Sequence, residues 1–166
     1  MRFSGIVLMG TIVLGACGGE KAAETKPAAE APAAAPAPTT AATPAAGAVA
    51  AAPITGKTIE VKMVGDDKGY RFEPSDIKLK AGDGIKFVVV SMGPHNVAFD
   101  AVSAGDQKAQ LDANMGADKM AELSSAMKMN PGESLTVSFA NIKPGVYRFN
   151  CTPHLAMNMK GTVTVQ

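Results

Sequence analysis

Apolar and polar residues alternate through most of the chain after residue 57. A period of two is typical of strands that bury one face. The alternating sets are Ile59, Val61 and Met63; Ile77 and Leu79; Leu135, Val137 and Phe139; and Val163 and Val165. The unbroken apolar run at residues 87–90 predicts a strand that is covered on both faces.

One segment departs from this alternation and follows a helical period instead. Its members are Met115, Lys119, Met120, Leu123 and Met127. They predict one short helix within residues 115–129, with its methionines filling the core. Glycine and proline turns at 81–84, 130–132 and 143–145 separate the predicted strands. Several short strands with one helix indicate an all-β fold, a β-sandwich over residues 57–166.

The first residues have the pattern of an export signal rather than of a strand of this sandwich. Residues 1–16 are apolar with one basic residue near the start, too short a run to cross a bilayer as a helix. The Leu-Gly-Ala-Cys sequence ending at Cys17 resembles a bacterial lipobox. We therefore expect a lipoprotein signal peptide, a lipidated Cys17, and a periplasmic or extracytoplasmic protein anchored to a membrane. The alternative is an ordinary cleaved signal that happens to contain a cysteine.

Residues 17–56 have the composition of a linker. Among residues 20–56, seventeen are alanine and six are proline. The prolines recur too often for a lasting helix, and few side chains are large enough to build a core. We expect a disordered tether that joins the anchor to the domain.

Charge excludes one class of partner. Residues 57–166 contain thirteen Lys and Arg against twelve Asp and Glu, and no basic stripe is interleaved with aromatic residues. Nucleic acid is therefore not an expected ligand.

The strongest chemical signal is a cysteine, a histidine and two methionines within nine residues. Cys151, His154, Met157 and Met159 follow one another closely, and His95 is the only other histidine in the chain. Each residue alone is more often simple core filler. Together, two imidazoles, a thiolate and a thioether are the ligands of a blue copper site, in which one copper ion carries electrons. Either methionine could close the loop as the axial ligand.

The strand pattern supports this ligand set. Tyr147, Phe149 and Cys151 alternate, so the cysteine is expected to point inward at the end of its strand. Pro153 stiffens the following loop. His95 must come from another strand, predicted over residues 96–99. The adjacent Asn96 is a candidate for hydrogen bonds that hold the ligands in place, although it could equally be a simple turn residue.

Across the predicted domain the chain resembles the plastocyanin-type cupredoxins. The matching motifs are Tyr-Arg-Phe-Glu-Pro-Ser-Asp-Ile at 70–77, Lys-Ala-Gly-Asp at 80–83, Pro-His-Asn-Val at 94–97, Asn-Pro-Gly-Glu at 130–133, Cys-Thr-Pro-His at 151–154 and Gly-Thr-Val-Thr-Val at 161–165. The resemblance implies a Greek-key β-sandwich and one type 1 copper. It implies that the ligands are His95, Cys151, His154 and Met159, the register selecting Met159 over Met157. It also implies an apolar electron-transfer surface around His154, formed by Gly93, Pro94, Leu155 and Ala156.

Two departures from photosynthetic plastocyanins affect the expected partners. Those proteins have an aromatic residue before the cysteine, flanked by acidic residues, where this chain has Asn150 and scattered carboxylates at Asp100, Asp106, Asp112 and Asp118. The lipobox and tether are also foreign to them. The resemblance and these differences favour a bacterial respiratory role. The expected partners are redox proteins such as cytochrome c, a quinol-oxidising complex or a terminal oxidase.

Two other functions compete with electron transfer. Copper enzymes related to this family need further histidines or a second cysteine in the ligand loop, so we expect no enzyme activity and no organic substrate. A periplasmic copper chaperone or storage protein is the more serious alternative, motivated by Met115, Met120, Met127, Met129 and Met157. A chaperone needs an open, exchangeable site, whereas Cys151 is expected to be buried.

Overall fold

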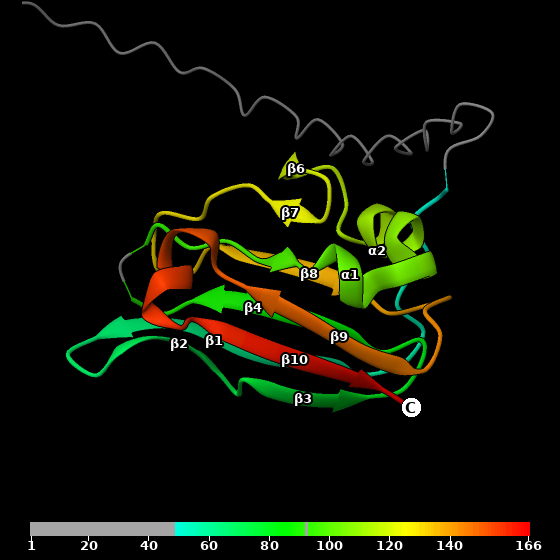
Figure 1. The fold of residues 1–166 in the computed structure, drawn as a ribbon, viewed down its shortest axis with the longest axis horizontal. Coiled ribbons are helices and arrows are strands. Elements are labelled where there is room, and N and C mark those ends of the chain that lie inside the picture. The colour runs from blue at the N-terminus through cyan, green and yellow to red at the C-terminus, as the bar shows by residue number, and fades with distance from the viewer. Residues whose placement is uncertain (1–48, 92) are drawn as a thin grey trace, which may run out of the picture. The chain divides into compact units, whose positions relative to one another are not determined.

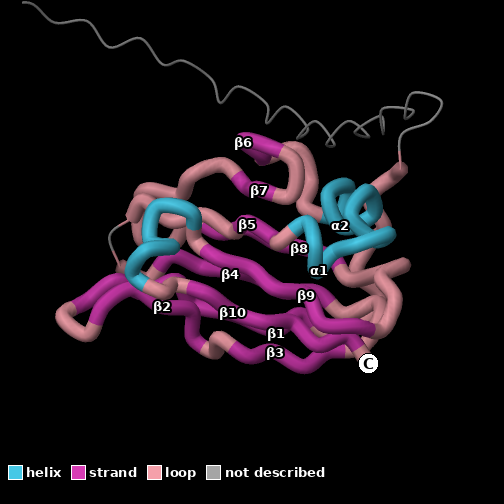
Figure 2. Tube along the Cα trace, in the orientation of Figure 1, coloured by secondary structure: helices cyan, strands magenta, loops and turns pink. Residues whose placement is uncertain are grey.

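Two β-sheets pack face to face around one core (Figure 1, Figure 2). The computed structural model describes residues 49–91 and 93–166. The expected signal peptide, Cys17 and most of the expected linker lie outside these residues. The predicted all-β sandwich is confirmed.

The first sheet has the strand order β2-β1-β4-β8. Its members are β1 (Thr58–Asp66), β2 (Gly69–Glu73), β4 (Gly84–Val89) and β8 (Ser134–Ser138). Strands β1 and β4 run parallel, and the other two pairings are antiparallel. The parallel pair lies at the centre of the sheet, so segments distant in sequence build its middle.

The second sheet has the strand order β3-β10-β9-β5-β7-β6. Its members are β3 (Asp76–Leu79), β5 (Ala98–Phe99), β6 (Lys119–Ala121), β7 (Ser124–Ser125), β9 (Gly145–Asn150) and β10 (Lys160–Val165). The long antiparallel pair β9–β10 flanks the loop that holds Cys151 and His154. Both ends of that loop are therefore fixed by one ladder of hydrogen bonds.

The alternating residues meet in the core as the pattern predicts. Val61, Met63 and Val137 are fully buried, and Val163 lies opposite them on β10. The prediction for residues 87–90 is wrong, because β4 buries only one of its faces. Phe87 and Val89 point inward, whereas Val88 is only half-buried and Val90 is 48% exposed. An unbroken apolar run does not by itself show that both faces are covered.

The helix predicted over residues 115–129 is also misplaced. The helical segment is α1 (Ala101–Ala104), a 3-10 turn η1 (Gly105–Gln107) and α2 (Lys108–Asn114), which ends where the predicted helix begins. Gly116 follows with a φ of +78° and terminates the helix. The next residues form the β6–β7 hairpin. Of the methionines expected in the core, Met115 is buried, but Met120 and Met129 are more than half exposed.

Residues 50–56, which the sequence assigns to the linker, contact the domain. The buried amide of Asn114 accepts a hydrogen bond from Ala52 N at 2.8 Å. It donates to Ser138 O and Ala140 O at 3.0 and 2.9 Å, so one side chain joins this segment to α2 and the end of β8. Among residues 49–91 and 93–166, no helix is long and apolar enough to pass through a bilayer.

Candidate metal centre

Three potential metal ligands converge at one end of the sandwich. The Sγ of Cys151 lies 3.8 Å from Nδ1 of His95 and 3.4 Å from Nδ1 of His154. All three ligand atoms lie within 4.8 Å of one another. His95 and Cys151 are fully buried, and His154 is 5% exposed. Two imidazole nitrogens and a sulfur at this spacing surround a space that suits one copper ion.

The strand β9 delivers Cys151, and a short turn returns the next ligand candidate. Cys151 directly follows β9, whose Tyr147 and Phe149 are buried as the alternation predicts. The 3-10 segment η2 (Thr152–Met157) then folds back, with Pro153 in its first turn. Cys151 N donates to Met159 O at 3.0 Å, which closes the loop at its base.

His95 reaches the site from a segment that is only partly a strand. The predicted strand at 96–99 is shorter than expected, because only Ala98–Phe99 belongs to β5. His95 instead forms an isolated two-way backbone pairing with Lys128, with N···O distances of 2.9 and 2.7 Å. Gly93 makes this approach possible, since a Cβ there would lie 2.4 Å from Lys128 O.

Asn96 connects the two ligand segments. It is fully buried, and its Oδ1 accepts a hydrogen bond from Thr152 N at 2.7 Å. Its Nδ2 donates to Thr152 Oγ1 at 3.2 Å and to Ser124 Oγ at 3.1 Å. Because Thr152 follows Cys151 and Asn96 follows His95, this amide sets the spacing between the two segments.

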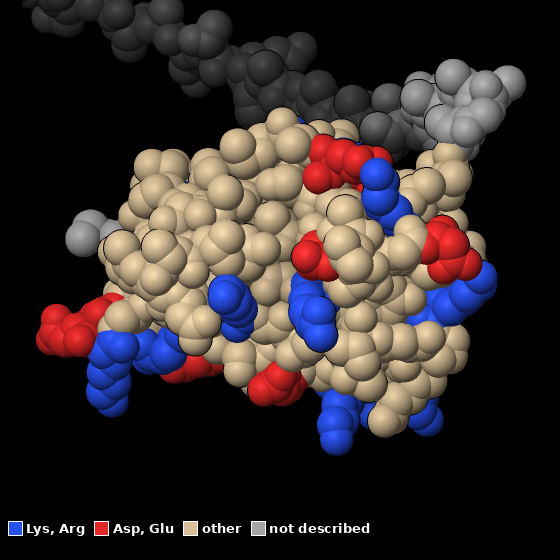
Figure 3. Space-filling view, viewed as in Figure 1, with Lys and Arg blue, Asp and Glu red and all other residues tan. Residues whose placement is uncertain are grey.

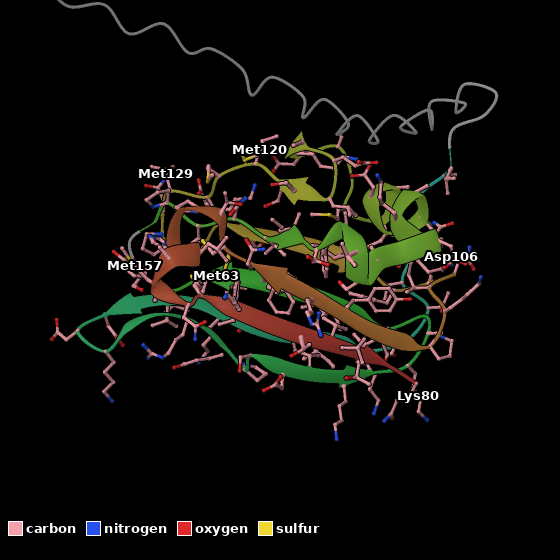
Figure 4. All side chains as sticks on the ribbon, viewed as in Figure 1. Met63, Lys80, Asp106, Met120, Met129 and Met157 are labelled. Carbon is pink, nitrogen blue, oxygen red and sulfur yellow. The ribbon has the colours of Figure 1, made fainter. Side chains whose placement is uncertain are left out.

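The two methionines of the loop lie in opposite environments. Met159 is fully buried and belongs to the same apolar cluster as Cys151. Met157 is 58% exposed at the end of η2 (Figure 4). Asn158 adopts the left-handed conformation between them, with a φ of 62°, and reverses the chain. Met159 is therefore the thioether that shares the buried environment of the three converging ligands.

Burial disfavours the charged forms of Cys151 and His154. It raises the pKa of the Cys151 thiol, an effect that the nearby backbone N–H groups oppose. Burial also lowers the pKa of His154, which favours the neutral imidazole that metals bind. A metal that binds Cys151 as a thiolate must therefore displace its proton. Soft sulfur and borderline nitrogen ligands in a buried site fit copper.

Tyr70 is the site residue that sequence reasoning missed. Its ring stacks on His154 with a centroid distance of 3.6 Å and an interplanar angle of 12°. Tyr70 lies near the start of β2, which is far from His154 in sequence but packs against η2. An aromatic residue at the start of a strand was the available signal, but the contact with His154 depends on which strand lies beside the ligand loop.

An apolar surface surrounds the converging residues. Leu155 is 44% exposed, Ala156 is exposed, and Gly93 and Pro94 are half-buried. Exposed Met129 and Met157 lie at this same end of the domain (Figure 4). Around η2 the visible surface is largely uncharged, and charged side chains cluster below it at the β1–β2 turn (Figure 3). From Leu155, a hollow of about 510 Å³ follows β9 and β10 between Arg148 and Lys160.

Comparison with known proteins identifies the family. Residues 59–166 match the family described as copper binding proteins, plastocyanin/azurin family. The chain is 35% identical over 117 residues to plastocyanin of Prochlorothrix hollandica, covering 70% of this chain and 79% of that protein. It is 36% identical over 114 residues to plastocyanin of Nostoc punctiforme, covering 68% and 76%.

A solved structure agrees with these sequence matches. The oxidised plastocyanin of Dryopteris crassirhizoma is 31% identical, with a TM-score of 0.50, covering 65% of this chain and all of that one. The family match covers well over half of the chain and includes every residue of the converging cluster. This chain therefore belongs to the plastocyanin/azurin family of copper-binding proteins.

Proposed function

We propose that this protein is a one-electron carrier that cycles a single type 1 copper between Cu(II) and Cu(I). His95 and His154 would hold the ion through imidazole nitrogens and Cys151 through a thiolate, and Met159 would supply a weaker thioether ligand. The observation that supports this most is the convergence of three buried ligand atoms within 4.8 Å from segments 56 residues apart.

Backbone contacts of the fold hold these ligand residues in place. Cys151 is fixed by β9 and by its bond to Met159 O, and His95 by its pairing with Lys128. When bound, copper would supply the one-electron couple. The buried protein residues would hold the ligand positions constant and exclude water, so that little rearrangement would accompany electron transfer.

Electrons pass through the apolar end of the domain. His154 is the only one of the three converging residues with any exposed surface, and Leu155, Ala156, Gly93 and Pro94 surround it. A second route through Asn150 is disfavoured, because an amide replaces an aromatic ring. The carboxylates at 106, 112 and 118 are each engaged with a lysine, and Asp100 caps α1. They form no shared acidic surface for a partner.

The proposed partners follow from this surface and from the family. They are redox proteins with an apolar contact surface, such as cytochrome c, a quinol-oxidising complex or a terminal oxidase. We place the protein outside the cytoplasm, with residues 1–16 as a signal peptide, Cys17 as the lipidated first residue and residues 17–56 as the tether. Mass spectrometry of the membrane fraction tests the anchor, since an unmodified N-terminus in a soluble fraction would refute it.

A copper chaperone or storage role is the second candidate. The exposed sulfurs of Met120, Met129 and Met157 favour it, since thioethers bind Cu(I). The burial of Cys151 opposes it, because a delivered ion must leave easily. Slow exchange of copper with a chelator would support the electron carrier, and fast exchange would support the chaperone.

The absorption spectrum of the copper-loaded, oxidised domain tests the proposed function. We expect an intense thiolate-to-Cu(II) band towards the red end of the visible range. Cys151→Ser should abolish the colour while leaving the sandwich folded. Met157→Leu is the matched control in the same loop and should stay blue. A colourless copper-loaded wild type would reject the type 1 site.

A further inference from the structure

The contact between Tyr70 and His154 is the closest ring pairing at the site. The two rings lie nearly parallel with centroids 3.6 Å apart. His95 meets the same tyrosine edge-on at 6.1 Å. Tyr70 thus covers one face of the His154 imidazole, and the other ligand imidazole lies beside it.

A glycine on the neighbouring strand makes room for this stack. The register of β1 and β2 places Gly65 opposite Tyr70. A Cβ on Gly65 would lie 2.6 Å from Cε1 and 2.8 Å from Cδ1 of the tyrosine ring. Gly65 is not in the left-handed region, so its backbone conformation does not require glycine. The tyrosine ring therefore explains why position 65 has no side chain.

Among the described residues, the other contacts of the His154 ring come from the ligand cluster itself: Cys151 Sγ lies 3.4 Å from its Nδ1, and the His95 ring meets it edge-on at 5.1 Å. His154 lies at a break in η2, with φ −110° and ψ 18°, rather than within a regular helix. Rotation of an imidazole about its last side-chain torsion is broad, so packing must select one orientation. The stacked Tyr70 ring is a contact that comes from outside the ligand cluster and covers a whole face of the imidazole. The phenol hydroxyl makes no hydrogen bond among the described residues, so the ring face is the contact that matters.

We propose that Tyr70 is a positioning residue for His154, and that Gly65 leaves the space that the tyrosine ring occupies. The tyrosine ring holds the imidazole plane so that Nδ1 faces Cys151 Sγ before any metal binds. It also slows departure of His154 from the ion once copper is bound. The second effect rests on the proposed function; the first does not. A metal-bound imidazole is electron-poor, and the electron-rich tyrosine face then attracts it further.

Four variants test this assignment. Tyr70→Leu removes the aromatic face, Tyr70→Phe keeps it, and Gly65→Ala displaces the ring without changing it. The double variant Gly65→Ala/Tyr70→Leu shows whether the glycine acts through the tyrosine. Circular dichroism establishes that each variant folds.

Two measurements are made on each variant. The first is the mobility of the His154 ring in the metal-free protein, from NMR relaxation. The second is the rate at which a Cu(I) chelator, bathocuproine disulfonate, removes copper. Loss of an aromatic stack changes an equilibrium constant by up to about tenfold, which sets the upper limit of the expected effect. We expect Tyr70→Leu and Gly65→Ala to raise both ring mobility and copper loss, the latter up to about tenfold. Tyr70→Phe should match the wild type, and the double variant should exceed neither single one.

Several results would overturn the proposal. Unchanged ring mobility in both Tyr70→Leu and Gly65→Ala would show that the stack does not position His154. A Tyr70→Phe variant that behaved like Tyr70→Leu would assign the effect to the hydroxyl instead. Additive effects in the double variant would show that Gly65 acts independently of the tyrosine. Failure of the proposed function is distinguishable, because it would leave the wild type colourless while the metal-free ring measurement still stands.

Discussion

A single amide, that of Asn96, joins the two ligand segments. Its removal leaves the Thr152 N–H without the partner that lies 2.7 Å away. We expect Asn96→Ala to lower the free energy of unfolding by about 0.5–1.5 kcal/mol, the usual net contribution of a hydrogen bond, because Thr152 itself is exposed. It should also shift the visible band of the copper form, because Thr152 adjoins Cys151. Urea unfolding and the spectrum measure the two effects.

The control for Asn96 is Ser124→Ala. That change removes only one acceptor of the Asn96 amide and leaves the bonds to Thr152 intact. Its effect on the spectrum should be smaller. Equal spectral shifts in the two variants would mean that the bonds to Thr152 do not control the ligand spacing.

Met159 and Met157 form a natural matched pair for testing the axial ligand. A thioether favours Cu(I), so an amide oxygen in its place should lower the reduction potential. We expect Met159→Gln to lower it clearly and Met157→Gln to change it little, because only Met159 is buried with Cys151. Voltammetry resolves this, since 59 mV corresponds to about 1.4 kcal/mol for one electron. A larger shift in the Met157 variant would reverse the assignment.

Among single residues, the candidate ligands could be found from sequence, because their chemical types are rare in combination and those of the loop lie close together in the chain. In the structure Met159 is buried and Met157 is exposed, which agrees with the choice of Met159 that the family resemblance implies. Tyr70 could not be found in the same way. Its role depends on a tertiary contact between β2 and η2, and on the space above Gly65, neither of which is a property of local sequence.

Among the elements, the turn before β4 is held by one carboxylate. Asp83 accepts hydrogen bonds from Lys57 N at 2.8 Å and from Lys80 N at 2.9 Å, so it links the start of β1 to the end of β3. These backbone bonds, that from Lys80 foremost, hold the pKa of Asp83 below its ordinary value. A depressed pKa in the folded state stabilises the fold above the unfolded pKa, and this stabilisation is lost as the pH falls through the folded value.

We therefore expect Asp83→Asn to lower the melting temperature at pH 7, with a difference from wild type that shrinks as the pH falls below about 4. Calorimetry across this range measures it. Asp67→Asn, in the exposed β1–β2 turn, controls for the loss of one negative charge. A difference that stayed constant down to pH 2 would exclude the charged form of Asp83 as its source.

Period-two strands were predictable from sequence, and the helix was not. The strands bury one face in a regular sheet, so Val61, Met63 and Val163 reveal their environment directly. The residues of α1 and α2 have few buried members, chiefly Ala104, Leu111 and Asn114, and Val102 is 90% exposed. Their apolar pattern is thus weak. The methionines at 115–129 imitate a helical period but straddle Gly116 and a hairpin.

For the molecule as a whole, copper should act as a cross-link between segments that are distant along the chain. A ligand that binds only the folded state adds about 2.7 kcal/mol of stability at a free concentration of 100 times its Kd. We expect copper to raise the melting temperature of the wild type and to have little effect on Cys151→Ser. Calorimetry with and without copper measures this. Equal stabilisation of both proteins would place the binding elsewhere.

Both ends of the described domain lie opposite the ligand loop. Residues 50–56 pair with Gly82 and Asn114, and Gln166 N donates to Leu79 O at the same end, whereas η2 lies at the other (Figure 1). A cysteine or affinity tag added before residue 49 or after residue 166 would therefore attach the domain to a solid electrode with His154 facing the solution. Such a film should exchange electrons readily with reduced and oxidised partners in solution but slowly with the electrode beneath, because the whole length of the sandwich separates the ligand cluster from the electrode surface.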